Sequence, residues 1–591
     1  MATVSNSYTV ERGRPSARAM VVAGTGLDWA AKYSMTERIL PAAGFAIRNL
    51  TSDIPDRIAR KALPKPVSWV WNRAMSRKSS KSPTPIVIGR APLTVGEVVA
   101  IARGEAIELD LEALSRVGRG RALINSLASD STPHYGVSTG FGALATTFIA
   151  ADRRAQLQHS LVRSHAAGTG SEVEQEVVRG LIALRLQTLM TGRTGVRPEV
   201  CQAYGGMLNA GVTPVVYEFG SLGCSGDLAP LSHVALVAIG EGRARVKGGP
   251  ILEGASALAM AGLTPIALKE KEGLALINGT DGMLAMLCIA LDKIATLLGA
   301  ADVAAAMSVE GLLGTDRVFQ DELHTLRPHP GQSQSARIMA QILAESPIIA
   351  SHAGPEDGRV QDAYSLRCAP QVHGAARDTA RHAMAVAEVE LGSTIDNPVI
   401  TASGSLESNG NFHGAPIAYV LDFLAIALAD VASMSERRTD RFMDVSRNHG
   451  LPPFLAHEVG VDSGLMIAQY TAAGLVSEMK RLAAPASVDS IPSSAMQEDH
   501  VSMGWHAGRK LFTAIDALTR VLAIEMMAAS RALALRAPLK PSPITGSIAD
   551  RINGLSGGPG PDRFMTPDID EVVTLISSGT IQALNDAVDD E

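Results

Sequence analysis

The segment from Asp281 to Leu313 restricts the fold more than any other, because it is rich in Ala, Leu and Met and apolar nearly all round. A helix of that kind must be enclosed by other protein on every side. The segment therefore predicts a helix at the centre of a bundle. Further helical patterns that could surround it cover about Asp152–Thr191 and also Ala375–Leu391, His413–Arg437, Ser463–Ala484 and Ser502–Arg536.

Clear alternating strands are few, so we expect a mainly α protein built as a long antiparallel helical bundle, with a small mixed region at the start of its body. This region opens with the β-like run PIVIG, and the capping-box spacing of Thr94 and Glu97 then predicts a helix start. Near the end of the chain, Lys540–Pro567 is rich in Pro and Gly, and Asp568–Ala587 could form a last helix.

Charge divides the chain into two parts. Residues 1–85 carry 14 Lys and Arg against 5 Asp and Glu, a net charge of +9, whereas the remainder carries 39 against 55, a net charge of −16. We expect residues 1–85 to be a basic, loosely ordered extension, or the result of a start codon assigned too far upstream; binding to a membrane surface or a partner is the alternative. The acidic body, residues 86–591, argues against nucleic-acid binding.

The cysteines and the apolar runs indicate a cytoplasmic protein. The four cysteines are far apart and form no CxxC pair, which favours a reducing compartment over a disulfide framework or a zinc site: Cys201, Cys224, Cys288 and Cys368. No membrane span is expected, because the best apolar run, Tyr419–Ala432, is interrupted by Asp422 and Asp430. The N-terminus does not have the pattern of a secretory signal.

The run GCSGDLAPL at Gly223–Leu231 carries the most informative chemistry. In a sharp turn the amide nitrogen of Gly226 can attack the carbonyl carbon of Cys224, and the ring that forms loses water. Ser225 then loses its hydroxyl, which leaves an electrophilic 4-methylidene-imidazol-5-one made from the chain itself. Glycine suits the attacking position because it allows close backbone approach. The alternative is a Gly-rich turn before a helix, with Asp227 near its N-terminus.

Such an electrophile would help to eliminate ammonia from an amino acid, since the amine is a poor leaving group and the β-proton is weakly acidic. Tyr135, in the Gly-rich loop YGVSTGFGALA, could take that proton if nearby positive charge lowered its pKa. Asn278, in LINGT, could hydrogen-bond the substrate or the electrophile. The alternatives are a structural tyrosine and a turn or cap asparagine.

Three further motifs offer binding groups. QDAYSLRCAPQVHG contains Gln361 with Tyr364 and Arg367, which would share one helix face, and the guanidinium could clamp a carboxylate. NGNFHGAP places Phe412 where its ring could pack on a substrate, and MQEDHVSM offers Glu498. A surface ion pair, a core aromatic and a capping or metal cluster are the alternatives. Metal ligation is weakly supported, since no HExxH-like spacing occurs, and no metal site is expected.

Together and in this order, the blocks GSLGCSGDLAPLSH, YGVSTGFG, SLRCAPQV, GNFHGAP and QEDHVSM resemble the aromatic amino acid ammonia-lyase family over about residues 86–585. The family uses the self-made imidazolone. The resemblance implies a helical homotetramer whose active sites draw on more than one subunit. It assigns Tyr135 as base, Arg367 as carboxylate clamp, and Asn278 and Tyr364 as support for the electrophile and amine. Cys224 replaces the usual Ala, which should not prevent cyclisation.

The resemblance also points to a substrate. LVRSHAAG carries Ser164 and His165, the pair seen in histidine-specific members. Glu498 could pair with an imidazole N–H, whereas against a phenyl ring it would be buried and unpaired. We therefore expect L-histidine to be converted to trans-urocanate and ammonia, with His165, Glu498, Gln361 and Phe412 shaping the imidazole pocket. The alternatives are a lyase or 2,3-aminomutase acting on tyrosine or phenylalanine, and a non-catalytic relative with an uncyclised loop.

Overall fold

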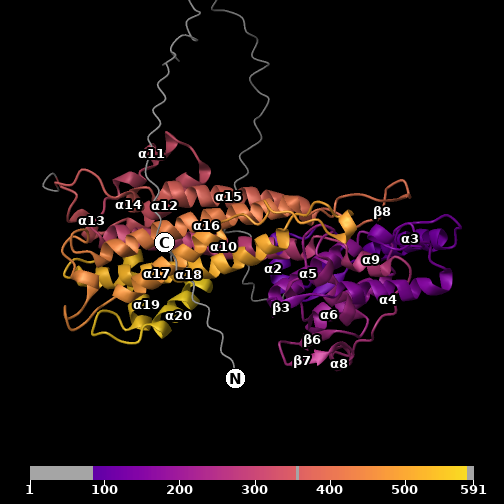
Figure 1. Cartoon of the computed structure of the whole chain (residues 1–591). Coiled ribbons are helices and arrows are strands. Elements are labelled where there is room, and N and C mark those ends of the chain that lie inside the picture. Colours follow the sequence, from indigo (N-terminus) through magenta and orange to yellow (C-terminus); the bar gives the residue numbers. More distant parts are fainter. Residues whose placement is uncertain (1–83, 355–357, 582–591) are drawn as a thin grey trace, which may run out of the picture. The chain divides into compact units, whose positions relative to one another are not determined.

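The computed structural model describes residues 84–354 and 358–581, which include the central helix that the sequence predicts (Figure 1). This helix, α10, spans Asp281–Gly311, and nearly all of its residues are buried. Four long helices pack against it: α5 (Gln175–Leu189), α15 (Ala369–Leu391), α16 (Ala415–Met443) and α18 (Gly504–Leu535). A further long helix, α17 (Met466–Leu482), packs against α16 and α18. The predicted mainly α fold is confirmed.

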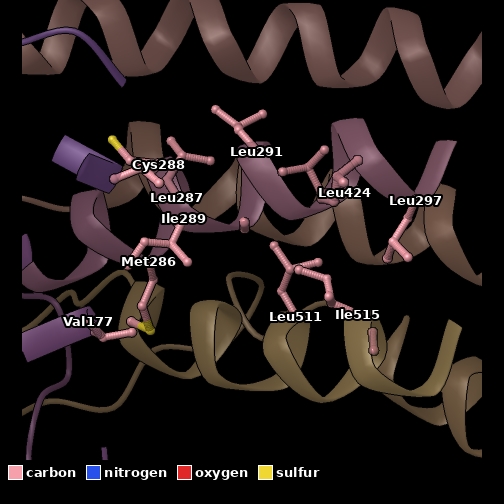
Figure 2. Close-up of a cluster of buried hydrophobic side chains, with 14 of the residues drawn as sticks. Val177, Met286, Leu287, Cys288, Ile289, Leu291, Leu297, Leu424, Leu511 and Ile515 are labelled. Atoms are coloured by element: carbon pink, nitrogen blue, oxygen red, sulfur yellow. The ribbon is translucent and has the colours of Figure 1, made fainter. Parts of the chain in front are cut away.

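Figure 2 shows why α10 needs no polar face. Met286 and Leu287 project from it in different directions, and both side chains are fully buried. Val177 of α5, Leu424 of α16 and Leu511 of α18 reach the same cluster from neighbouring helices. Burying a side chain of this size contributes about 1.5–3 kcal/mol relative to leaving it exposed. The core therefore fixes where the ends of α10, α16 and α18 lie.

A small mixed region precedes the bundle. The predicted β-like run forms β1 (Ile86–Ile88), which pairs in parallel with β2 (Ile107–Leu109). Thr94 caps α2 (Val95–Ala102), and its capping box with Glu97 is complete, as predicted. The other elements before α10 are α3 (Leu111–Ala128), α4 (Arg154–His165), β3 (Thr169–Glu172), α6 (Pro198–Ala210), β4 (Val212–Pro214), β5 (Tyr217–Phe219), α7 (Leu228–Ala238), β6 (Arg243–Val246), β7 (Ile251–Glu253), α8 (Gly254–Met260) and α9 (Glu272–Ile277).

Small sheets and short helices make up the rest of the described fold. The antiparallel pairs are β3 with β5, β4 with β6, β6 with β7, and β8 (Val399–Ile400) with β9 (Leu406–Glu407). The remaining α-helices are α11 (Asp321–Thr325), α12 (Pro330–Leu343), α13 (Pro347–Ala350), α14 (Tyr364–Arg367), α19 (Pro543–Ser556) and α20 (Thr566–Ser577). Five single turns of 3-10 helix complete the described elements: η1 (Gly142–Leu144), η2 (Ala151–Arg153), η3 (Arg317–Phe319), η4 (Pro453–Leu455) and η5 (Ser494–Met496).

Two regions differ from the sequence patterns. The helical pattern of Asp152–Thr191 is broken between α4 and α5, because a side chain at Gly170, which has φ +97°, would lie 2.7 Å from the Phe219 ring. The Pro- and Gly-rich tail contains α19, which starts where Ser542 caps the helix and a proline follows it. The predicted last helix corresponds to α20, but it ends at Ser577, before Gly579 with φ +73°, rather than continuing to Ala587; residues beyond 581 lie outside the described residues.

Two stretches, Glu272–Gly311 and Ala415–Met443, are long and apolar enough to cross a membrane by length and composition alone. Their most apolar windows are 78% and 61% buried inside the fold. Their apolar character is explained by packing, because they are the central helices of the bundle.

Candidate active site

The Cys-Ser-Gly turn lies between β5 and α7, and the buried carboxylate of Asp227 fixes its far end. One carboxylate oxygen, Oδ1, accepts a hydrogen bond from Ser221 Oγ at 2.8 Å, and Oδ2 accepts one from the amide of Met283 at 2.9 Å. Full burial raises the pKa of Asp227 to about 7, against the lowering effect of these hydrogen bonds. The start of α7 is thereby tied to the first turn of α10.

Gly226 packs closely against the backbone of Gly279. It has φ +76°, and a Cβ built on it would lie 2.1 Å from the carbonyl oxygen of Gly279. The Asp227 amide donates to that same oxygen at 2.7 Å. No hydrogen bond engages the Gly226 amide nitrogen within residues 84–354 and 358–581. Only glycine fits this position, and its nitrogen is free to react.

The near end of the turn is held by the starts of two long helices. The Gly223 carbonyl oxygen accepts a hydrogen bond from Ser502 Oγ at 2.7 Å and one from the amide of Gly414 at 3.2 Å. Ser502 lies two residues before the start of α18, and Gly414 caps α16. Phe412 precedes Gly414 in this loop and is half-buried.

Glu498 contacts the triad with both carboxylate oxygens. Ser225 Oγ donates to Oε1 at 2.7 Å, and Cys224 Sγ donates to Oε2 at 3.3 Å. Ser493 Oγ donates to Oε2 at 2.9 Å. Burial and the nearby Glu498 charge raise the pKa of the Cys224 thiol to about 12. The thiol is therefore a neutral donor near pH 7, and the carboxylate spans both side chains.

The segment before Glu498 has unusual backbone geometry. Ser494, Ala495 and Met496 all have positive φ, at 49°, 53° and 69°. Non-glycine residues rarely adopt this conformation, and each one costs about 1–2 kcal/mol. The turn is closed by paired backbone hydrogen bonds between Ser493 and Glu498. This strained turn directs the carboxylate toward the triad.

Tyr135 and His165 lie within the electrostatic reach of Glu498. Burial raises the pKa of Tyr135, the Gly142 amide that donates to its oxygen at 3.2 Å lowers it, and the Glu498 charge raises it further. The condition set by the sequence analysis, a positive charge that lowers this pKa, is not met within the described part of one chain. Burying the phenol beside a carboxylate has the opposite effect.

His165 is the last residue of α4, and its burial favours the neutral form of its ring. Desolvation lowers its pKa, although the Leu161 carbonyl and the Glu498 charge oppose the shift. Its Nδ1 lies 2.9 Å from the carbonyl oxygen of Leu161, which can only accept, and 3.0 Å from Ser164 Oγ, whose own hydrogen can go to the same carbonyl. These contacts assign the proton to Nδ1. The Nε2 atom of the neutral ring is then an acceptor.

Asn278 lies beside Gly279, under the triad. Its Nδ2 donates to the carbonyl oxygen of Asn397 at 3.2 Å, whereas its buried Oδ1 has no hydrogen-bond partner among the described residues. A buried amide oxygen without a donor is costly. This atom is ready to accept a hydrogen bond from a bound molecule.

A buried ion pair that the sequence analysis missed supports these loops. Lys271 Nζ donates to Asp396 Oδ2 at 2.7 Å, and both side chains are fully buried. The Lys271 stem runs below Gly136, next to Tyr135, and Asp396 precedes Asn397. No local pattern marks this pair, because its members are 125 positions apart. Ser493 and Ser502 were missed too, although both lie close to Glu498 in sequence.

Three predicted residues lie far from the triad within one chain. Gln361 is exposed, and Tyr364 and Arg367 form one turn, α14, in which the guanidinium carbon lies 4.7 Å from the tyrosine ring centroid. This confirms that the last two share a face. The α14 backbone accepts from Arg438, near the C-terminal end of α16, at 3.1 Å. Since α16 begins at the triad and rises 1.5 Å per residue, α14 lies about 35 Å from the triad along this helix.

The residues at the triad fit the imidazolone that the sequence predicts. The turn is sharp, the Gly226 nitrogen is unengaged, and the orphan Asn278 oxygen supplies an acceptor beside it. Among residues 84–354 and 358–581, no group of three or more His, Cys, Asp or Glu side chains could hold a metal ion. All four cysteines are free.

The bundle of long helices holds a Cys-Ser-Gly turn in contact with a carboxylate, and a tyrosine lies within the electrostatic reach of that carboxylate. A family model described as aromatic amino acid lyase matches residues 93–553, and the chain belongs to that family. Members of this family use the methylidene-imidazolone group. The family and fold predicted from the sequence motifs are confirmed.

Named relatives agree with this assignment. A curated histidine ammonia-lyase from Streptomyces avermitilis is 59% identical over 499 residues, which cover 84% of this chain and 97% of the relative. The crystal structure of histidine ammonia-lyase from Trypanosoma cruzi has a TM-score of 0.78 at 36% identity and covers 85% of this chain and 95% of that one. Tyrosine aminomutase from Streptomyces globisporus has a TM-score of 0.80 at 34% identity, with 85% and 98% covered.

Proposed function

We propose that this enzyme eliminates ammonia from L-histidine to give trans-urocanate. The activity predicted from the sequence agrees with the name of the Streptomyces avermitilis relative. The observation that carries the proposal is the position of Glu498, a carboxylate on the triad that also acts electrostatically on His165 and Tyr135. An imidazole substrate has the N–H groups that such acceptors need.

Cys224, Ser225 and Gly226 would close to the 4-methylidene-imidazol-5-one. When formed, this group supplies an electrophile that turns the substrate amine into a better leaving group. The surrounding residues would place the substrate against it. Asn278 would accept a hydrogen bond through its unpartnered Oδ1, and Phe412 would border the pocket from the loop before α16.

Tyr135 would take the β-proton, as a base must lie beside the reacting carbon. Its pKa is raised in the single chain by burial and by Glu498. The role therefore requires a positive charge near the phenol in the complete site. Arg367 is the candidate, since it would also clamp the substrate carboxylate.

That clamp would come from a second copy of the chain, because Gln361, Tyr364 and Arg367 lie about 35 Å from the triad along α16. The buried Nε of Arg367 has no hydrogen-bond partner among the described residues. We propose a homotetramer in which each site combines both ends of the bundle. A cytoplasmic location is proposed on the four free cysteines.

His165 and Glu498 would select the substrate ring. Neutral His165 offers the Nε2 acceptor and Glu498 a carboxylate, so two N–H groups of an imidazolium could be paired at once. A phenyl or phenol ring offers no N–H at these positions and would leave buried acceptors unpaired, at about 1–3 kcal/mol each.

A combined substrate and mass measurement tests the proposal. The wild-type enzyme should release urocanate from L-histidine and have an intact mass lower than its sequence mass by two waters, about 36 Da. Ser225→Ala should fold and assemble but lose turnover, because alanine cannot form the methylidene. Activity of this variant within about tenfold of wild type, roughly 1.4 kcal/mol of barrier, would remove the electrophile from the mechanism. Turnover of tyrosine or phenylalanine in preference to histidine would instead support an aminomutase or another lyase.

A further inference from the structure

In the uncyclised chain, the carboxylate of Glu498 is hydrogen-bonded to Ser225. Its Oε1 accepts the Ser225 hydroxyl at 2.7 Å, the shortest contact it makes, while Oε2 accepts Cys224 Sγ and Ser493 Oγ. Ser225 is the residue that must lose that hydroxyl. The Glu498 charge acts on Tyr135 and His165, but neither of these residues forms a hydrogen bond to Ser225 within the described ranges.

We propose that Glu498 is the catalytic residue for the dehydration of Ser225 during maturation. This inference rests on the proposed function only in that it requires the triad to cyclise. It gives Glu498 a task that is separate from substrate binding and that is completed before the first turnover.

The protons and electrons of this step balance without any added reactant. Ring closure joins the Gly226 nitrogen to the Cys224 carbonyl carbon and releases the carbonyl oxygen as water, with one hydrogen from the Gly226 nitrogen and one from the Ser225 nitrogen. The Glu498 carboxylate then takes the Ser225 Cα proton. The electron pair of the Cα–H bond forms the Cα=Cβ bond, the Cβ–Oγ bond breaks, and the carboxyl returns the proton to the departing hydroxide, which leaves as water.

The geometry suits this two-way transfer. In a serine, the Cα hydrogen and Oγ are separated by only a few bonds. A carboxylate that is hydrogen-bonded to Ser225 Oγ is therefore close to the Ser225 Cα hydrogen as well. Ser493 and the strained turn at Ser494–Met496 hold the carboxylate in place. A general base must be within hydrogen-bond reach of its target, and among the described side chains only Glu498 hydrogen-bonds to Ser225.

This order of events also explains how one carboxylate can serve two purposes. While Ser225 keeps its hydroxyl, Oε1 is occupied by a strong hydrogen bond. Departure of the water removes that donor and leaves Oε1 unpaired in a half-buried position, where an imidazole N–H can replace it. Maturation therefore prepares the substrate site as it makes the electrophile.

Intact-mass measurement of the purified, assembled enzyme tests this inference without depending on turnover. Wild type should be lighter than its sequence by about 36 Da, whereas Glu498→Gln should retain the Ser225 hydroxyl and be lighter by at most one water, about 18 Da. Tyr135→Phe is the matched control. It alters a neighbouring site residue but keeps the carboxylate, so it should lose both waters.

A second variant distinguishes loss of the catalytic group from misfolding. Glu498→Asp keeps the charge but withdraws it by one methylene, and a mass time course after synthesis should show maturation at least tenfold slower than in wild type. Full loss of both waters by Glu498→Gln, at the wild-type rate, would overturn the role of Glu498 and leave the proposed function standing. Absence of any mass loss in wild type would instead overturn the proposed function.

Discussion

Replacement of His165 by leucine should separate substrate selection from the rest of catalysis. The structure makes His165 a neutral acceptor, because Nδ1–H is committed to the Leu161 carbonyl at 2.9 Å and burial lowers the pKa of the ring. Leucine keeps the apolar bulk of the side chain but offers no acceptor. A histidine substrate would then carry one buried N–H without a partner.

The magnitude follows from the cost of that unpaired group, about 1–3 kcal/mol, which corresponds to a decrease of about 5- to 150-fold in kcat/KM for L-histidine. For phenylalanine the change should be small or favourable, since the ring gains an apolar neighbour. The quantity to measure is the ratio of kcat/KM for histidine to that for phenylalanine. This ratio is independent of the fraction of enzyme that has matured.

Arg163→Leu is the matched control, since Arg163 lies on the same helix and its guanidinium pairs with Glu241. It should leave the ratio unchanged. Because the pKa of His165 is lowered, its neutral form persists to more acidic pH than that of a free histidine. The selectivity should therefore decline only as the pH falls through that lowered value. An unchanged ratio in His165→Leu would refute the assignment of the Nε2 acceptor.

Three further outcomes are expected. Tyr135→Phe should lower kcat far more than substrate affinity, because it removes a proton acceptor and keeps the ring; an unchanged kcat would place the base elsewhere. Because its pKa is raised to about 12, the Cys224 thiol should resist iodoacetamide at pH 8 in the folded enzyme and react only after unfolding. Peptide mass mapping would detect the modified thiol. Labelling of Cys224 in the native protein would contradict its burial. Removal of residues 1–85 should leave activity and assembly largely unchanged, since relatives that match this chain over 97–98% of their own length align with only 84–85% of it; loss of folding would make the extension structural.

The long helices could be predicted because the apolar residues within each segment already indicate which of its faces are buried. The all-apolar segment from Asp281 onward became α10, with an end at Gly311 that lies close to the prediction. The break between α4 and α5 could not be predicted in this way. It depends on Gly170 packing against Phe219, and on a hydrogen bond from the Gly168 amide to His233, 65 positions away. Periodicity within a window does not report such contacts.

Helix α19 is a different case, since its signals were present in the sequence. Ser542 followed by Pro543 is a cap with proline at the first helical position. The high Pro and Gly content of the surrounding segment concealed this start. Composition averages over a window, whereas a helix start depends on two particular residues.

The chemistry of the site was predictable where it is local and not where it depends on distant contacts. Cyclisation needs adjacent residues, so Cys224, Ser225 and Gly226 could be read directly. The hydrogen bond between Ser225 and Glu498 joins residues 273 positions apart, and the unpartnered oxygen of Asn278 depends on how its loop packs. The family resemblance indicated that these residues belong together, but not which atoms meet.

The distribution of charge along α16 gives the strongest physical reason to expect a shared site. At its N-terminal end the triad is surrounded by acceptors, including Glu498 and the free oxygen of Asn278. Near its C-terminal end lies Arg367 of α14, whose buried Nε has no hydrogen-bond partner among the described residues, beside a largely exposed Tyr364. An amino acid needs acceptors for its amine and a cation for its carboxylate within a few ångströms. One chain holds them about 35 Å apart. In the proposed homotetramer, two copies would place opposite ends of their bundles together, so that one site could bind a whole substrate.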